Sequence, residues 1–200
     1  MSGTSEFGEV LYTLTDLLVA AYNVVADTYG TPISIANGQL LTSEPESDND
    51  QMRGYGKVTR LLSVPIGVKI SFKAGGLDYS ALAAIAGVVN VQSGTSGSYI
   101  RRSQFPAGGR GLPYFGVIGV AAADDGGTAV IGHRMIKLDL FPKIDFNGET
   151  NKFVMSETAG YSAVPAAYTD LFIVKTYEDA ADFTAPISGA NFKTWFAAEV

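Results

Sequence analysis

Apolar and polar residues alternate along several stretches of the chain, and turn residues separate these stretches. The cleanest alternation puts apolar residues at every second position: Val64, Ile66, Val68, Ile70 and Phe72. This pattern predicts a strand over residues 57–73. Pro65 falls on the opposite face, which predicts an edge position or a bulge there. Residues 6–15 alternate in part and predict a strand, whereas the apolar run at 17–25 fits a buried strand or a helix.

The strongest hairpin pattern lies in the second half of the chain. Residues 113–123 are apolar and β-prone, Asp124-Asp125-Gly126-Gly127 forms a tight turn, and residues 128–141 return as the partner strand. Shorter strands are expected around residues 33–35, 153–157 and 171–177.

One segment has the spacing of a helix. Ala81, Leu82, Ile85 and Ala86 recur at helical intervals. Asp78 is placed to cap the N-terminus and Gly87 suits the C-terminal cap. A short helix is therefore predicted over residues 78–87.

Two polar segments and the C-terminus stand apart from these elements. Residues 42–56 predict a long acidic loop, and residues 90–111 predict a loop rich in Gly and Ser. The candidate inter-subunit contacts are the charged residues of these two segments: Glu44, Glu46, Asp48, Asp50, Arg101, Arg102 and Arg110. Residues 182–200 form an apolar arm that includes the aromatic residues Phe192, Trp195 and Phe196, and this arm is expected to dock on its own domain or on a neighbour.

These elements together predict a mainly β fold in a single domain over residues 1–200. The expected architecture is a β-sandwich or partly closed barrel with one short flanking α-helix and long loops. Hydrophobic residues make up 46% of the chain and charged residues 17%, against about 25% charged in average soluble domains. This composition favours surfaces buried against other subunits over a monomer with a surface rich in Ser, Thr and Gly.

The net charge, the lack of cysteine and the first residues limit the kinds of binding partner that are expected. The net charge of -6 argues against a protein that binds nucleic acid by neutralising phosphates. The absence of cysteine excludes disulfides and thiolate metal sites. The first residues lack a signal-peptide pattern, and no apolar run reaches the roughly 20 residues of a spanning helix. The chain is therefore expected to be soluble and cytoplasmic when made, with no membrane partner.

Few residues have the pattern of a catalytic, metal-binding or nucleotide-binding site. The one histidine, His133, lies inside a predicted strand, and a partly exposed or hydrogen-bonded strand residue is favoured over a catalytic base. The acidic segment lacks the central Gly and final Glu of a calcium loop. Gly108-Gly109-Arg110-Gly111 has no strand before it and no helix after it, so it does not match a nucleotide-binding loop. No catalytic residue, cofactor or metal is expected.

Several motifs, in this order, resemble the tail tube (major tail) proteins of long-tailed bacteriophages. They are Tyr29-Gly30-Thr31-Pro32, the helix entry Phe72-Lys73-Ala74-Gly75-Gly76-Leu77-Asp78-Tyr79-Ser80-Ala81-Leu82, the strand Leu112-Pro113-Tyr114-Phe115-Gly116-Val117-Ile118-Gly119, and the turn at 124–127. The resemblance spans about residues 9 to 160 and leaves residues 182–200 without a counterpart.

The resemblance implies a structural role rather than an enzymatic one. In that family the subunit is a β-sandwich with a flanking helix, six subunits form a ring, and stacked rings form a hollow tube through which genomic DNA leaves the head. It implies the chain itself as partner, together with tape measure, terminator and distal tail proteins, and DNA that passes without specific binding. It implies host cytoplasm during assembly and the virion afterwards, with the net negative charge toward the lumen, because basic lining would trap DNA.

Two other readings remain open from the residues. One is another assembly protein, such as a tail terminator, a head-decoration protein or the tube protein of a contractile secretion system. The other is a carbohydrate-binding or hydrolytic β-sandwich, which would need a pocket lined by paired carboxylates and aromatic side chains.

Overall fold

The computed structural model describes residues 12–35, 38–54, 57–75, 79–105, 111–139, 141–147, 152–165 and 167–197. The strands in these ranges are β1 (Tyr12–Asn23), β2 (Thr28–Tyr29), β3 (Ile33–Ser34), β4 (Gly38–Gly54), β5 (Lys57–Ala74), β6 (Val89–Ser93), β7 (Ile100–Gln104), β8 (Tyr114–Ala123), β9 (Thr128–Leu138), β10 (Lys143–Asn147), β11 (Lys152–Ala163) and β12 (Ile173–Tyr177). The helices are α1 (Tyr79–Ala86), the 3-10 turn η1 (Ala180–Asp182) and α2 (Gly189–Trp195).

One large antiparallel sheet organises the fold, in the order β2-β1-β8-β9-β11-β5-β4. β12 and β10 extend it by pairing with β9 and β11. The sheet curls until a Cβ built on Gly38 would lie 3.1 Å from the Cβ of Leu17. The described parts of β1 and β4 nevertheless form no strand pair, so the barrel stays open. The predicted mainly β, sandwich-like fold is confirmed.

The central strands are buried on both faces. Alternate residues of β1 enter two different cores, Leu17 and Val19 on the α1 side and Leu18 and Ala20 on the α2 side. Side chains alternate across a strand, so an apolar run that is buried on both faces carries no alternation. This explains the lack of alternation at residues 17–20, whereas Val24 and Val25 lie after the end of β1 and are exposed.

The predicted helix is confirmed as α1, which is buried through Ala81, Leu82 and Ile85. Gly87 ends it with φ 66, a left-handed conformation that favours glycine. Its amide donates to the carbonyl oxygen of Ala83 at 3.1 Å, as in an αL helix cap. The predicted cap Asp78 lies outside the described residues.

The predicted hairpin at residues 113–141 is confirmed as β8 and β9, joined by a turn in which Gly126 has φ 92. The strand predicted over 57–73 is β5. In its pairing with β4, Glu46 faces Gly67 and Ser47 faces Pro65. Residue 66 is thus the extra residue of a bulge beside Pro65, as the sequence predicted.

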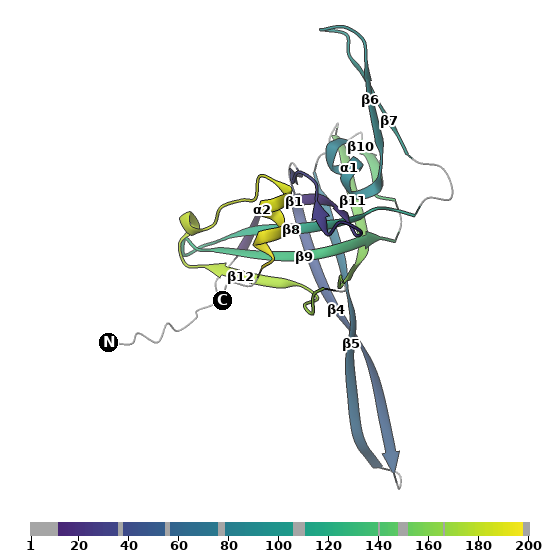
Figure 1. The fold of residues 1–200 in the computed structure, drawn as a ribbon, viewed down its shortest axis with the longest axis vertical. Helices are drawn as coiled ribbons and strands as arrows, with labels where there is room; N and C mark the ends of the chain where they lie inside the picture. Colours follow the sequence, from purple (N-terminus) through teal and green to yellow (C-terminus); the bar gives the residue numbers. More distant parts are fainter. Residues whose placement is uncertain are drawn as a thin grey trace.

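Both long loops were wrong predictions. Residues 42–54 belong to β4, which pairs with β5 along its length, and residues 90–93 and 100–104 belong to a second hairpin made by β6 and β7. Figure 1 shows the two hairpins projecting from the body in opposite directions. Polar composition misled the prediction because a strand that projects from the body satisfies its backbone with one neighbour and needs no core face.

The C-terminal arm docks on its own domain. Phe192, Trp195 and Phe196 of the arm are buried against the face of β1, β8 and β9 that lies opposite α1. Glycines in the sheet make room for their rings: a Cβ on Gly116 would lie 2.7 Å from Phe192, and a Cβ on Gly132 would overlap Trp195. The arm is therefore a second helical layer, which the sequence prediction of a single helix missed.

Polar contacts fix the arm in place. Lys193 Nζ donates to the Asp27 carboxylate at 2.7 Å, and this hydrogen bond is the main cause that holds the pKa of Asp27 below its ordinary value. The hydroxyl of Tyr22 donates to the same carboxylate at 2.8 Å. Arg134 is buried, donates to the carbonyl oxygen of Phe196 and pairs with Asp170 at 2.9 Å. The arm is thus bound by charges as well as by apolar packing.

Candidate assembly interface

The β4–β5 hairpin extends far beyond the rest of the sheet. The last β5 residue that pairs with β11 is Val68, which faces Pro45 of β4. From there to Gly54 the two strands pair only with each other, a reach of about 30 Å at roughly 3.3 Å per residue. Isolated two-stranded hairpins are marginally stable in water, so this segment is expected to be stabilised by contacts outside its own chain.

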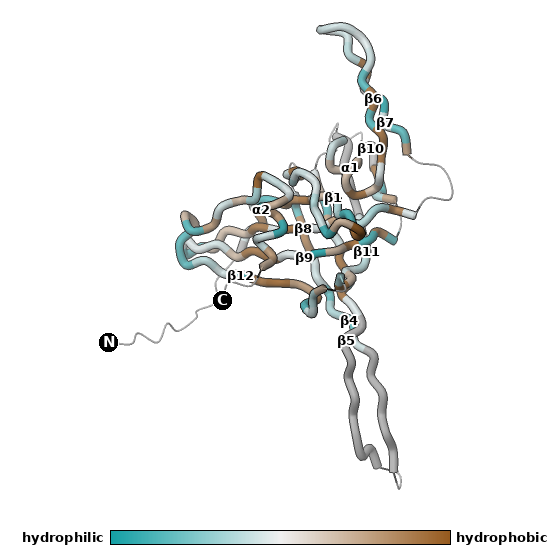
Figure 2. The backbone as a smooth tube through the Cα atoms, in the orientation of Figure 1, coloured by the Kyte–Doolittle hydropathy of each residue, from teal (hydrophilic) through white to brown (hydrophobic). Residues whose placement is uncertain are grey.

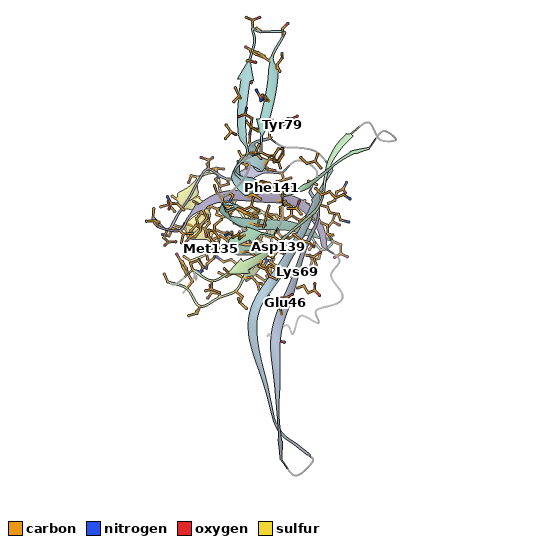
Figure 3. The ribbon with its side chains drawn as sticks, turned by 90° about the vertical axis from the view of Figure 1, so that its right-hand side faces the viewer. Glu46, Lys69, Tyr79, Met135, Asp139 and Phe141 are labelled. Atoms are coloured by element: carbon orange, nitrogen blue, oxygen red, sulfur yellow. The ribbon has the colours of Figure 1, made fainter. Side chains whose placement is uncertain are left out.

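The four candidate carboxylates of this hairpin are brought onto one strand. Glu44, Glu46, Asp48 and Asp50 occupy alternate positions of β4, and alternate positions share a face. Glu44 faces Lys69 of β5 in the register, and Figure 3 shows Lys69 and Glu46 where the hairpin leaves the body. Glu44 therefore has a lysine beside it within its own chain.

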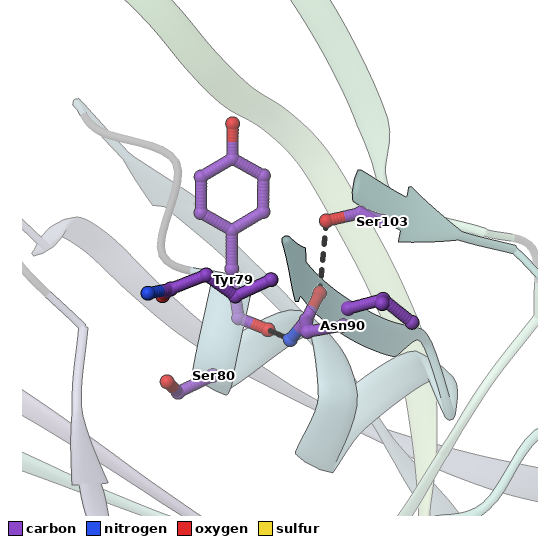
Figure 4. A pocket seen from close by; sticks show the side chains of 6 residues that line it. Tyr79, Ser80, Asn90 and Ser103 are labelled. Carbon is purple, nitrogen blue, oxygen red and sulfur yellow. Dashed lines mark hydrogen bonds between the residues drawn. The ribbon is translucent and has the colours of Figure 1, made fainter. Parts of the chain in front are cut away.

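The β6–β7 hairpin has two different faces. Directly opposite residues share a face, so Asn90 and Ser103 lie on one face, whereas Val91 and Arg102 lie on the other. Asn90 ties its face to α1: its Nδ2 donates to the carbonyl oxygen of Tyr79 at 2.6 Å and its Oδ1 accepts from the Ser103 hydroxyl at 2.8 Å (Figure 4). The opposite face is left to solvent.

That solvent face combines aliphatic residues with polar ones, since it also carries Ser93 and Gln104. Val89 and Val91 of β6 and Ile100 of β7 are all exposed, Ile100 to 68%, and Arg102 lies among them. We call Val89, Val91, Ile100 and Arg102 the hairpin face. Figure 2 shows hydrophobic and hydrophilic segments side by side along this hairpin. Exposed aliphatic side chains on a projecting ribbon are typical of a contact surface.

Two of the candidate arginines lie on a different hairpin from the candidate carboxylates. Arg101 and Arg102 lie on β7, whereas Glu44 and Glu46 lie on β4, and the two hairpins project from opposite ends of the molecule (Figures 1 and 3). Arg110 lies outside the described residues. A pairing of Arg101 or Arg102 with the carboxylates of β4 would therefore join different copies of the chain.

An apolar groove opens where the curled sheet fails to close. It has a volume of about 360 Å³. It is bounded by β1 and β4, and its floor comes from β8 and β9; the main lining residues are Leu14, Leu40, Leu41, Ala121, Ile131 and Val174. We call it the seam groove. Leu40 and Val174 are exposed at its rim. The sequence contains these apolar positions, but their gathering depends on the curl of the sheet.

Acidic residues gather at one end of the seam groove. The β8–β9 turn carries Asp124 and Asp125, and the chain after β12 carries Glu178 and Asp179. The two segments are adjacent, because the amide of Ala180 donates to the carbonyl oxygen of Gly126 at 3.3 Å. We call these four exposed residues the acidic rim.

His133 is a core residue. Its side chain is fully buried in β9, and its Nε2 lies 2.8 Å from the Ser43 hydroxyl of β4. No described residue bonds its Nδ1. Burial lowers the pKa of His133 to about 4. The hydrogen-bonded strand residue expected from the sequence is confirmed, and the ring lies where no substrate could contact it.

The buried histidine predicts a loss of stability in acid. The unfolded chain takes up a proton near pH 6.5, whereas the folded chain resists protonation until about pH 4, so folding stability is present above pH 6.5 and falls as the pH drops toward 4. Between pH 7 and 4.5, wild type is expected to lose about 2 kcal/mol more unfolding free energy than His133→Gln. Urea titrations at both pH values measure this difference. Equal losses in the two proteins would contradict it.

Within the described ranges, no group of three or more His, Cys, Asp or Glu residues is placed to hold a metal ion. Across the same residues, every helix is too short or too polar to cross a membrane. No protein-family model matches the chain, and no curated protein matches it either.

Proposed function

We propose that this chain is a structural subunit of a phage tail tube, which assembles with copies of itself into stacked hexameric rings. The rings enclose a hollow conduit through which genomic DNA passes without specific binding. The β4–β5 hairpin is the observation that carries the proposal, because its outer part pairs only with itself and a free hairpin of that length is marginal in water. Contact with a neighbouring copy supplies the missing stabilisation.

The positions of the two hairpins support a head-to-tail arrangement. They project in opposite directions from the body (Figure 1), so a contact that uses one hairpin leaves the other available for a further copy. Such heterologous contacts close into rings or extend as filaments. A tube of stacked rings needs contacts that close each ring and contacts that extend the stack.

The charged residues of the β4–β5 hairpin are proposed as inter-ring or inter-subunit contacts, as the sequence suggested. Their regular spacing on one strand supports an ordered contact, because alternate positions of a strand repeat at a fixed interval. The further partners follow the same proposal: tape measure, terminator and distal tail proteins, in the virion.

The proposed role involves no catalysis. The only histidine is buried in the core, and the seam groove is lined without a charged side chain. A site for acid–base chemistry needs a titratable group within reach of its substrate. These features favour an assembly surface over an active site.

Sedimentation velocity of the purified wild-type chain tests the proposal. Concentration-dependent association into species of six or more copies is the expected result. A terminator would give single rings that never grow. A single-chain boundary at every concentration would contradict self-assembly.

A further inference from the structure

We infer that the hairpin face of one copy docks into the seam groove of the next copy. This inference rests on the proposed self-assembly and names the two surfaces that join. It concerns the β6–β7 hairpin, to which the proposed function assigns no partner surface.

The apolar parts of the two surfaces are complementary. The seam groove is a concave surface lined by aliphatic and small side chains, with Leu40 and Val174 exposed at its rim. The hairpin face is a convex ribbon with three exposed aliphatic side chains. Joining them removes apolar area from water on both sides, which is the main driving force of association.

The backbone on both sides of the seam groove can also take part. At residues 12–16, β1 pairs with β8 along one edge, and its other edge, which faces the groove, pairs with no described strand. On the opposite side of the groove, β4 pairs only with β5. Unpaired strand edges accept an added strand from a partner through main-chain hydrogen bonds. A β-ribbon therefore suits this groove better than a helix does.

Charge fixes the direction and the register of docking. Arg102 sits among the aliphatic residues of the hairpin face, opposite Val91, and makes no ion pair with any described residue. The acidic rim lies at the end of the seam groove, about 10 Å from Ala121 along β8 at roughly 3.3 Å per residue. An arginine beside four carboxylates is favourable.

This assignment pairs Arg102 with the acidic rim rather than with the carboxylates of β4. Glu44 already faces Lys69 across the β4–β5 hairpin, whereas the acidic rim is made of exposed carboxylates at the mouth of an apolar groove. Arg102 also shares its face with the residues that need an apolar partner. The rim is thus the better complement to the whole hairpin face.

Disulfide crosslinking tests the docking, because the chain has no cysteine of its own. The test variant carries Val91→Cys and Val174→Cys, both at exposed positions. Head-to-tail docking is expected to give a ladder of covalent dimers, trimers and larger species under mild oxidation, whereas each single-cysteine variant gives dimers at most. The matched control carries Val25→Cys with Val174→Cys, since Val25 is 98% exposed and lies outside the hairpin face.

A charge exchange tests the register. Arg102→Glu is expected to slow ladder formation in the test variant about two- to fivefold, and adding Glu178→Arg is expected to restore the rate. Failure of the second change to restore the rate would overturn the assigned register.

The crosslinking result and the presence of tubes together distinguish a failure of the docking from a failure of the proposed function. Tubes without a ladder above the Val25 control would overturn the docking and leave the tube subunit standing. A ladder without tubes would support the docking and remove the tube. Neither ladder nor association would overturn both.

Discussion

Shortening the β4–β5 hairpin is expected to abolish assembly while leaving a folded chain. Replacing residues 47–66 by Asn-Gly joins Glu46 to Gly67, which already face each other, through a two-residue turn that suits such hairpins. The paired part that belongs to the body, including the contact between Ser43 and His133, is retained. Because the deleted part pairs only with itself, the chain loses its assembly contact and little of its own stability.

Two measurements check this prediction. Sedimentation velocity is expected to give a single-chain boundary under conditions in which wild type associates, and denaturant unfolding is expected to give a free energy within about 1 kcal/mol of wild type. Val25→Ser, a change at an exposed position on neither projecting hairpin, serves as the control and should assemble normally. Tubes formed by the shortened chain would show that this hairpin is not an assembly contact.

Replacing Phe196 by alanine is expected to lower the free energy of unfolding by about 3–5 kcal/mol. Phe196 is fully buried, and its ring packs near Tyr29, Phe192 and Trp195 with centroid distances of 5.0–5.9 Å. Domains are typically stable by only about 5–15 kcal/mol. A loss of this size would therefore leave the arm partly unfolded at moderate temperature.

The arm offers a matched control and a built-in probe. Ile187 lies in the same arm but is 81% exposed, so Ile187→Ala should change the unfolding free energy by less than about 0.5 kcal/mol. Trp195 is the only tryptophan and is buried, so a red shift of its emission reports undocking. If Phe196→Ala is no less stable than Ile187→Ala, the arm does not dock on its own domain.

The sequence predicted well those elements whose pattern is set by burial. β5 alternates because one face enters the core, and β8 and β9 are joined by a turn whose glycine takes a conformation that favours glycine. The helix α1 was predicted from its spacing and its terminal glycine. In each case the local pattern and the tertiary environment call for the same residues.

The two hairpins were not predicted as strands because a strand that projects from the body needs no apolar face. The alternation of Glu44, Glu46, Asp48 and Asp50 is itself a strand pattern of period two, but in the absence of apolar partners it was interpreted as a solvated loop. In β6 the alternation of Val89 and Val91 with polar residues carried the same signal. β6 is exposed along its length, and the outer part of β4 pairs only with β5.

The aromatic residues of the arm have a spacing that predicts a helix. Phe192, Trp195 and Phe196 are spaced by three and four residues, as on one face of a helix, and Ser188 caps that helix by accepting from the amide of Asn191 at 3.2 Å. The receiving surface could not be predicted, because it depends on glycines in two distant strands, Gly116 and Gly132. The seam groove could not be predicted from the sequence either, because it forms only when the sheet curls.

Negative-stain electron microscopy of the wild-type chain, from dilute to concentrated solution, tests the central claim most directly. Because the claim is a ring-forming subunit, uniform hollow tubes or stacked rings with an axial hole are the predicted result. Solid fibres, or compact single-chain particles at every concentration, would contradict it.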